Sequence, residues 1–376
     1  MIYLKNILKD MVKNKNKPDY ILFFTIVFLI VLGILILASA SAAFSQERFG
    51  NPYHILKNQI IWGFIPGIIL GFIAFKIRLD IIKKWAPFLF LFFLILTAMV
   101  FLPKIGLELG GARRWLYFGG ISFQPSEFLK LGFILYLAFW LSSRNKEKKD
   151  FSQTFIAFLI IISLIGLILI NQPNVSTLGV LIAVGVLMYF LANTPLWHTA
   201  SMFLVGIIGL YILIKTAPYR MRRWITFLNP ETDPLGLSYH LQQALIAVGS
   251  GGIFGLGLGM SLQKFGFLPH SISDSIFAIF AEETGFIGAI ILIFLFLLIF
   301  WRIFKISKNT KDKFSELCVL GIGSWFIIQS FVNIGTMIGI LPLTGIPLPF
   351  ISHGGSHIIA ELIGVGILLN ISKSST

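Results

Sequence analysis

The stretch 286–301, FIGAIILIFLFLLIFW, would place apolar side chains on every face of a helix. Helices that are apolar all round are buried in a large protein core or in a membrane. The stretch belongs to an apolar segment that we predict to span 275–300, and about 20 such residues cross a bilayer. A transmembrane strand would be about ten residues long, with alternating side chains. The stretch therefore predicts a transmembrane helix.

Apolar segments of this kind recur along the whole chain. Of its 376 residues, 56% are hydrophobic and 12% are charged, and the mean hydropathy is +0.88. Soluble domains carry about 25% charged residues. We therefore predict an all-α polytopic membrane protein with about ten transmembrane helices. The expected spans are 20–43, 56–75, 85–102, 124–142, 152–170, 174–193, 196–216, 275–300, 315–340 and 353–372.

The basic residues predict the orientation of these spans. Most of the 30 lysine and arginine residues lie in 1–19, 76–84, 144–149 and 302–313, or at Lys373. Short cytoplasmic loops are enriched in such residues, so these segments and both termini should face the cytoplasm. We expect three parts: a cytoplasmic amphipathic segment on the membrane lipid over 1–19, a transmembrane domain over 20–372, and a cytoplasmic C-terminus over 373–376.

A second group of cations lies on segments that should face outward, where the orientation rule does not require them. Guanidinium groups bind phosphate oxygens through a planar fork of donors, so a phosphate-bearing substrate would explain the group. Anchoring to lipid head groups and simple loop solubility are the alternatives. The six residues are Arg113, Arg114, Arg220, Arg222, Arg223 and Lys264.

The longest connection, residues 217–273, should form a large outer loop. Connections of this length are usually functional or disordered. Its aromatic and leucine residues predict interfacial helices packed on the membrane domain. The glycine run over 249–259 lacks the Lys-Ser/Thr ending of a phosphate-binding loop, so close packing or flexibility explains it better than nucleotide binding.

Several acidic residues lie in or beside the spans, and each has two interpretations. Asp274 either caps a helix, three residues after Ser271, or acts as a general base with a raised pKa. Glu282 and Glu283 lie about 12–14 Å deeper along the same helix. They are functional candidates or hydrogen-bond partners of neighbouring segments. Glu361 is a further buried acid to which we assign no role.

Other polar residues in the spans favour structural interpretations. Glu127 and Lys130 are three apart on one predicted helix and can neutralise each other. His353 and His357 would share a helical face as metal ligands, but no third ligand stands at a diagnostic spacing. The single cysteine, Cys318, excludes both a disulfide framework and a cysteine metal site.

Four ordered sequence blocks run through most of the chain. They are GARRW at 111–115 with QPSE at 124–127 and Lys130; YRMRR at 219–223 with 229–230 and 233–234; GSGG at 249–252 through 263–264 and 268–269 to Asp274 and 282–283; and LP at 341–342 through Gly345 and PLPF at 347–350 to SHGGS at 352–356. Together they resemble the SEDS family, the FtsW, RodA and SpoVE proteins that polymerise peptidoglycan glycan strands, over about residues 20–372.

The resemblance implies an inverting glycosyltransferase that joins lipid II units and releases undecaprenyl pyrophosphate. Asp274 is the implied catalytic base. The implied substrate-binding residues are Arg114, Arg220, Arg223, Lys264, Glu127, Lys130 and Ser352. The implied supporting residues are Glu282, Glu283, Pro269 and Gln243. No tightly bound cofactor is implied, although a divalent cation at the pyrophosphate is compatible with this chemistry.

The resemblance also implies partners and a location. We expect a bacterial cytoplasmic membrane protein with an outward-facing active site, and no binding to nucleic acid. Lipid II, a class B penicillin-binding transpeptidase and other divisome or elongasome membrane proteins are the expected partners. The stretches 219–223 and 263–264 lean toward FtsW and septal synthesis rather than a RodA-like elongation role. A lipid II flippase and a complex scaffold remain alternatives from other functional classes.

Five positions depart from the family pattern. The acid and glycine of Gln-Pro-Asp-x-Gly-Thr are replaced by Asn174 and Ser176, which puts the role of that acid in doubt. His353 replaces a usual tyrosine, His240 a common glutamine and Ser275 an aromatic residue. Asp274 and the outer arginines are retained.

Overall fold

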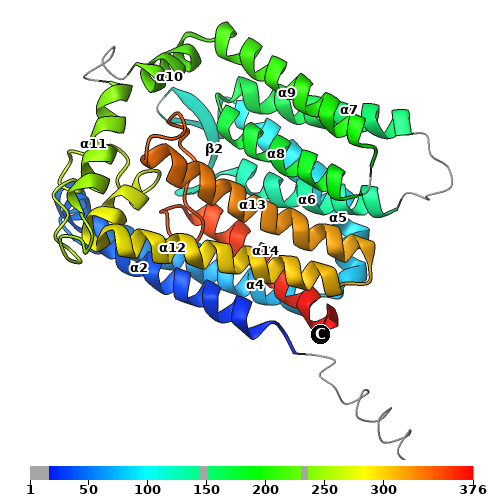
Figure 1. Cartoon of the computed structure of the whole chain (residues 1–376), viewed down its shortest axis with the longest axis horizontal. Helices are drawn as coiled ribbons and strands as arrows, with labels where there is room; N and C mark the ends of the chain where they lie inside the picture. The colour runs from blue at the N-terminus through cyan, green and yellow to red at the C-terminus, as the bar shows by residue number, and fades with distance from the viewer. Residues whose placement is uncertain (1–16, 110, 144–150, 193, 230–235, 376) are drawn as a thin grey trace, which may run out of the picture.

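The structure is a computed structural model that describes residues 17–109, 111–143, 151–192, 194–229 and 236–375. Residues 1–16 of the expected surface segment over 1–19 lie outside the described residues, as do the charged or proline-containing stretches at 144–149 and 230–235. Long helices lie side by side, with β2, α10 and α11 at one end and the C-terminus at the other (Figure 1). We call these the site end and the opposite end.

Ten helical segments of the described chain match the ten predicted spans in order and position. Seven of them are long and apolar enough to cross a membrane, and α7 and α8 contain shorter apolar stretches. The prediction of an all-α polytopic membrane protein is therefore confirmed. The segments are α2 (Tyr20–Phe49), α3 to α4 (His54–Lys76, interrupted by the π-helix η1, Ile60–Phe64), α5 (Leu79–Ala98, followed by the 3-10 helix η2, Met99–Phe101), α6 (Pro125–Ser142), α7 (Phe151–Asn171), α8 (Val175–Leu191), α9 (Leu196–Thr216), α12 (Ile276–Asn309), α13 (Lys313–Met337) and α14 (Gly355–Ser375).

The helices differ in how much protein covers them. Most of α13 and α14 is buried among other helices, and α6 is buried along nearly its whole length. In contrast, little of α9 is buried, and it carries large exposed apolar side chains that suit a lipid environment. The buried helices α6, α13 and α14 are therefore the ones that carry polar residues inward.

A small antiparallel sheet lies between α5 and α6, and the sequence analysis did not predict it. Its strands are β1 (Gly106–Leu109), β2 (Ala112–Phe118) and β3 (Ile121–Phe123), paired in that order. The turn between β2 and β3 is Gly119-Gly120, both with positive φ, at 55° and 92°. A two-glycine turn between β-forming residues is a hairpin signal that was available in the sequence.

The outer loop contains the predicted helices, α10 (Pro218–Leu228) and α11 (Leu237–Ser250). Turns then lead through 251–275 back to α12. In the glycine run, a Cβ on Gly255 would lie 2.2 Å from the carbonyl oxygen of Glu283. Close packing is therefore the correct explanation of this glycine.

The helix α12 is interrupted at Gly285, whose φ of 69° and ψ of −168° are not helical. The segment 252–257 supplies hydrogen bonds at this break. Leu256 and Gly257 donate their N–H groups to the carbonyls of Glu282 and Glu283, at 3.0 Å each, and Phe286 donates to Gly252 at 2.9 Å. The break thus attaches the outer loop to the helix that follows Asp274.

Candidate functional site

A cavity of about 200 Å³ lies near the site end of the bundle, and we call it the central cavity. It brings together residues that are more than 200 positions apart in the sequence. Asp274, Arg114, Glu127, Lys130 and His357 all line it. The structure therefore places the predicted base beside one predicted arginine and the predicted ion pair.

Asp274 lies two residues before the start of α12 but does not cap it. The N-cap residue is Ser275, and no side chain accepts a capping hydrogen bond there. The capping interpretation of Asp274 is therefore wrong. Its carboxylate points toward Gly345, where an added Cβ would lie 3.2 Å from Oδ2. Since Gly345 also has a φ of 73°, glycine suits this position for both space and backbone conformation.

Two effects of the surroundings act in opposite directions on the pKa of Asp274. Burial raises the pKa of the carboxyl group, while electrostatic interactions with His270, Arg223 and Arg114 act to lower it. The net direction is upward. A carboxylate with a raised pKa is a stronger proton acceptor, as a general base requires.

The segment before Asp274 is held by the segment before α14. Ser352 is fully buried; its Oγ donates to the carbonyl of Ser273 at 2.7 Å and accepts from the N–H of Leu348 at 2.7 Å. The N–H of His353 donates to the carbonyl of Ile272 at 3.0 Å. Ser352, predicted to bind substrate, thus positions the Asp274 segment and does not line the central cavity.

Three predicted arginines share a second cavity of about 180 Å³, which we call the arginine cavity. Arg114 comes from β2, while Arg220 and Arg223 come from α10. Backbone carbonyls hold them: Arg114 donates to Gln172 at 3.3 Å and to Pro173, Arg220 to Leu213 at 3.0 Å, and Arg223 to Leu343 at 3.2 Å.

No carboxylate of the described chain lies within salt-bridge distance of these three guanidinium groups. Burial lowers the pKa of Arg114, and the neighbouring charge of Arg223 lowers it further. Clustered cations without an anionic partner favour an incoming anion. Arg114 lines both this cavity and the central one, so the anion would lie next to Asp274.

The other predicted outer cations do not join this cavity. Arg113 follows the alternation of β2 to the other face, where it pairs with Glu108 at 2.9 Å. Arg222 is exposed on α10. Lys264 is 7% exposed and pairs with Glu283 at 3.2 Å, facing a third cavity instead.

The acidic pair on α12 holds the outer loop. Glu282 accepts from the hydroxyl of Ser261 and, at 3.1 Å, from the N–H of Leu262. Glu283 accepts from Ser39 on α2 at 2.5 Å and from Lys264. The hydrogen-bonding interpretation of both glutamates is therefore correct.

The two other supporting residues differ in their surroundings. The carbonyl of Pro269 accepts from the hydroxyl of Ser275 at 2.9 Å. Gln243 is half-buried on α11 and lines none of the three cavities.

Comparison with known proteins gives the chain its family. Residues 20–376 match the model for FtsW, RodA and SpoVE, described as "Cell cycle protein". The chain belongs to the FtsW/RodA/SpoVE family. It is 37% identical to "Stage V sporulation protein E" of Bacillus subtilis strain 168, covering 97% of this chain and 100% of that one. It is also 37% identical to the "Probable peptidoglycan glycosyltransferase FtsW" of Wigglesworthia glossinidia brevipalpis, covering 93% and 92%.

Solved structures agree with this membership. One chain of a peptidoglycan synthase complex that coordinates polymerization and crosslinking aligns with a TM-score of 0.75 and 28% identity, over 95% of this chain and 98% of that one. The rod shape determining protein RodA of Thermus thermophilus aligns with a TM-score of 0.68 and 26% identity, over 94% of this chain and 96% of that one.

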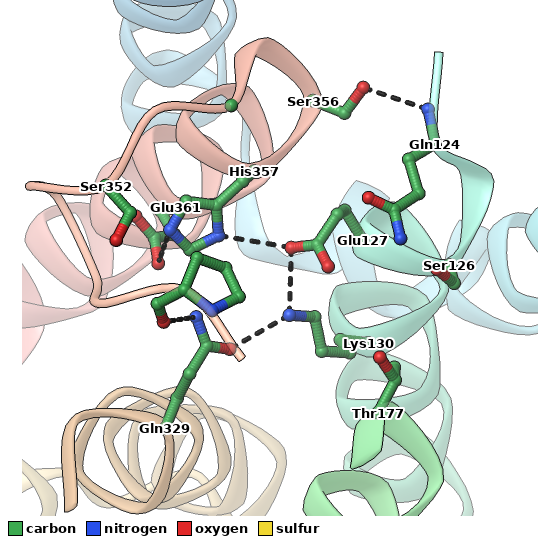
Figure 2. Close-up of polar contacts among 12 residues, drawn as sticks. Gln124, Ser126, Glu127, Lys130, Thr177, Gln329, Ser352, Ser356, His357 and Glu361 are labelled. Atoms are coloured by element: carbon green, nitrogen blue, oxygen red, sulfur yellow. Dashed lines mark hydrogen bonds and ion pairs between the residues drawn. The ribbon is translucent and has the colours of Figure 1, made fainter. Parts of the chain in front are cut away.

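A buried polar network in this FtsW/RodA/SpoVE chain includes residues that line the central cavity (Figure 2). The predicted pair is confirmed, with Lys130 Nζ 2.8 Å from Glu127 Oε2. Lys130 also donates to Gln329 at 2.9 Å, and Gln329 donates to the carbonyl of Pro347 at 3.1 Å. Neither residue of the pair is more than 4% exposed.

His357 extends this network, and the sequence analysis missed that role. Its Nδ1 lies 3.2 Å from Glu127 and its Nε2 lies 3.2 Å from Glu361. Glu361 also accepts from the N–H of Phe350 at 2.8 Å. The i, i+4 spacing of His357 and Glu361 was a signal for their contact. The described residues contain no group of three ligands that could hold a metal, so the histidine pair gains no third ligand there.

Two of the residues that depart from the FtsW/RodA/SpoVE pattern contact each other. His240 Nε2 lies 2.7 Å from the hydroxyl of Ser275. Burial, with the charges of His270 and Arg223, lowers the pKa of His240 to about 4, so the ring is neutral at pH 7. The Ser275 proton goes to Pro269, so His240 must donate from Nε2. The contact ties α11 to the residue after Asp274.

The remaining replacements also make contacts of their own. Asn174 accepts from Thr177 at 2.7 Å and donates to Ser126 at 3.3 Å, joining the start of α8 to α6. Ser176 donates to the carbonyl of Thr344 at 2.6 Å, beside the arginine cavity. The uncharged residue at 174 thus contributes to packing.

Proposed function

We propose that the chain is a peptidoglycan glycosyltransferase that polymerises lipid II with inversion at the anomeric carbon. The observation that carries the proposal is the position of Asp274: its cavity shares Arg114 with a cluster of guanidinium groups that no carboxylate of the described chain neutralises. Transfer of a sugar from a pyrophosphate leaving group needs a base for the acceptor hydroxyl and, next to it, a site for the anion. Asp274 and the arginine cavity match these two requirements. The name of the Wigglesworthia relative supports the same activity.

In this mechanism, the 4-hydroxyl oxygen of the acceptor sugar attacks the anomeric carbon of the donor. Asp274 takes the hydroxyl proton as the new carbon–oxygen bond forms. The bond from the anomeric carbon to the pyrophosphate oxygen breaks, and undecaprenyl pyrophosphate leaves with the bonding electron pair. Arg114, Arg220 and Arg223 stabilise the charge that grows on it.

The proposal includes no tightly bound cofactor. A divalent cation arriving with the pyrophosphate would meet arginines rather than carboxylates in the arginine cavity. The arginines themselves therefore supply the positive charge in this mechanism.

The decisive experiment measures lipid II polymerisation by the purified Asp274→Asn variant. Asparagine keeps the shape but cannot take the proton, so we expect the rate to fall by about 10²–10⁴-fold. Asp80→Asn is the control, because the Asp80 side chain is 84% exposed and distant in sequence from the site. A normal polymerisation rate for Asp274→Asn would disprove the base assignment. Translocation of lipid II in vesicles without glycan products would support the flippase alternative.

We further propose a septal role and a class B penicillin-binding partner. FtsW-named relatives and the stretch 219–223 support the septal role, and similarity to a chain of the peptidoglycan synthase complex supports the partner. The site end would face outward, with both termini and the Lys-rich segments in the cytoplasm. Rescue of cells that lack the division polymerase, but not of cells that lack the elongation polymerase, would test the septal role. Co-purification with the transpeptidase would test the partner.

A further inference from the structure

A third cavity, of about 500 Å³, lies beside the segment that leads to Asp274, and the proposed mechanism does not use it. We call it the outer cavity. The segment 268–273 forms one wall, and Ala43, Phe44 and Glu47 at the end of α2 form another. Its volume is in the range of small-molecule sites, about 300–1,000 Å³.

The outer and central cavities meet at two residues. Ser273 and His353 line both of them. Ser273 directly precedes Asp274, and the N–H of His353 donates to the carbonyl of Ile272. The outer and arginine cavities share no lining residue, so a molecule in the outer cavity would reach toward Asp274 by a separate approach.

The charges of the outer cavity differ from those of the arginine cavity. No arginine lines it among the described residues, and Lys264 is neutralised by Glu283 at 3.2 Å. Glu47 on the rim is exposed and would repel an anion. A pyrophosphate is thus disfavoured here.

The polar and aromatic groups of the wall suit an uncharged sugar. Hydroxyl and imidazole groups come from Ser271, Ser273 and His270, and aromatic rings come from Phe44 and Phe265. Saccharides offer both hydroxyl groups and apolar ring faces, and pockets with aromatic walls and a few polar groups recognise such ligands. Burial lowers the pKa of His353, so this ring is neutral.

A transferase that joins two sugars needs two sites that meet at its base. We infer that the outer cavity binds the uncharged saccharide end of the acceptor and presents its hydroxyl to Asp274 past Ser273 and His353. The donor pyrophosphate occupies the arginine cavity. This inference rests on the proposed glycosyl transfer and adds the location of the second substrate.

Cysteine protection can test the inference without measuring activity. The only cysteine of the chain, Cys318, is fully buried in α13, so an introduced surface thiol reacts alone. Ser271→Cys places a thiol in the outer cavity, and Ser176→Cys places one in the arginine cavity. Phe267→Cys is the control, because Phe267 is 53% exposed and lines none of the three cavities. Each full-length variant is treated with a membrane-impermeant maleimide.

The probes are an uncharged tetrasaccharide of N-acetylglucosamine and undecaprenyl pyrophosphate. At about ten times its Kd, each probe should slow labelling of its own site about tenfold. We expect the tetrasaccharide to protect Ser271→Cys alone, undecaprenyl pyrophosphate to protect Ser176→Cys alone, and neither probe to protect Phe267→Cys. Labelling of Ser271→Cys that the tetrasaccharide leaves unchanged, or that undecaprenyl pyrophosphate slows, would overturn the inference.

A second variant links the cavity to polymerisation. Ala43→Trp would fill the outer cavity from α2, and we expect polymerisation to fall about tenfold or more because the acceptor is excluded. In the double variant Ala43→Trp/Ser176→Cys, undecaprenyl pyrophosphate should still slow labelling of the introduced thiol. This protection would show that the double variant is folded. Normal polymerisation by Ala43→Trp would overturn the inference, whereas a wild-type protein that makes no glycan product from lipid II would overturn the proposed function itself.

Discussion

Asp274 is buried near two arginines and a histidine, and the balance of these effects decides how basic its carboxylate is. Burial raises its pKa, whereas His270, Arg223 and Arg114 act in the opposite direction. The sequence supported two interpretations of Asp274 equally, a general base and a helix cap. Only the contacts of the folded chain separate the two, because Arg114, Arg223 and His270 come from three different segments: β2, α10 and the turns before α12.

The pH dependence of polymerisation should report this balance. His270 makes the largest contribution that lowers the pKa of Asp274, so His270→Asn should raise that pKa. Because the base must be ionised to accept a proton, the acidic limb of kcat/KM should move to higher pH. Asparagine is chosen because His270 has a φ of 54°, which asparagine tolerates. His54→Gln is the control, since His54 lines none of the three cavities; an acidic limb that stays in place in His270→Asn would refute the assignment.

His357 and Glu361 should be energetically coupled. Each is buried, and their closest atoms are 3.2 Å apart. Removing one partner of a buried pair leaves the other uncompensated and typically costs about 3–5 kcal/mol. We therefore expect His357→Gln and Glu361→Gln each to lower the free energy of unfolding. The double variant should lose less than the sum of the two; strictly additive losses would show that the residues act independently.

At the scale of elements, the break in α12 is the feature that joins the outer loop to the membrane domain. Gly285 takes a backbone conformation reserved for glycine, and the carbonyls before it accept hydrogen bonds from 256–257. Sequence patterns showed an apolar span here but gave no sign of where it breaks. The break depends on a partner segment about 30 residues earlier in the chain.

Gly285→Ala should therefore destabilise the protein. The added Cβ would lie 2.3 Å from the backbone nitrogen of Gly255, in addition to the conformational strain. Strain of this kind costs about 1–3 kcal/mol, so we expect a lower thermal unfolding temperature and less polymerisation. Gly179→Ala on α8 is the matched control, because nothing lies within 4 Å of its added Cβ. Equal thermal unfolding temperatures for the two variants would contradict the role of the break.

At the scale of the whole molecule, the opposite end is fastened by contacts among three helices. Asp19 caps α2 through the N–H of Leu22 at 2.9 Å and pairs with Arg302 of α12. Its own N–H donates to Ser372 of α14 at 3.0 Å. Asp274, two residues before α12, and His357, in the first turn of α14, lie at the other end of these two helices. A substitution at the opposite end should therefore change the free energy of unfolding without changing the rate of polymerisation.

Asp19→Asn tests this separation. Asparagine keeps the helix cap but loses the charge, leaving Arg302 without its partner in a largely buried place. We expect unfolding to become easier by about 2–3 kcal/mol, less than for a fully buried pair because Arg302 is partly exposed. Polymerisation measured well below the unfolding temperature should stay near the wild-type rate. A large loss of rate at low temperature would show that the two ends are coupled.

The sequence by itself determined the ten helical spans, the helices of the outer loop, the family and the pair Glu127–Lys130. Hydropathy and i, i+3 spacing are local properties, so they can be read along the chain. Only the tertiary structure decided that Arg114 lies on a strand beside Asp274, that Lys264 is paired away from the arginines, and that His357 joins two glutamates. These contacts join segments far apart in the sequence, and their energies depend on burial that exists only after the helices pack together.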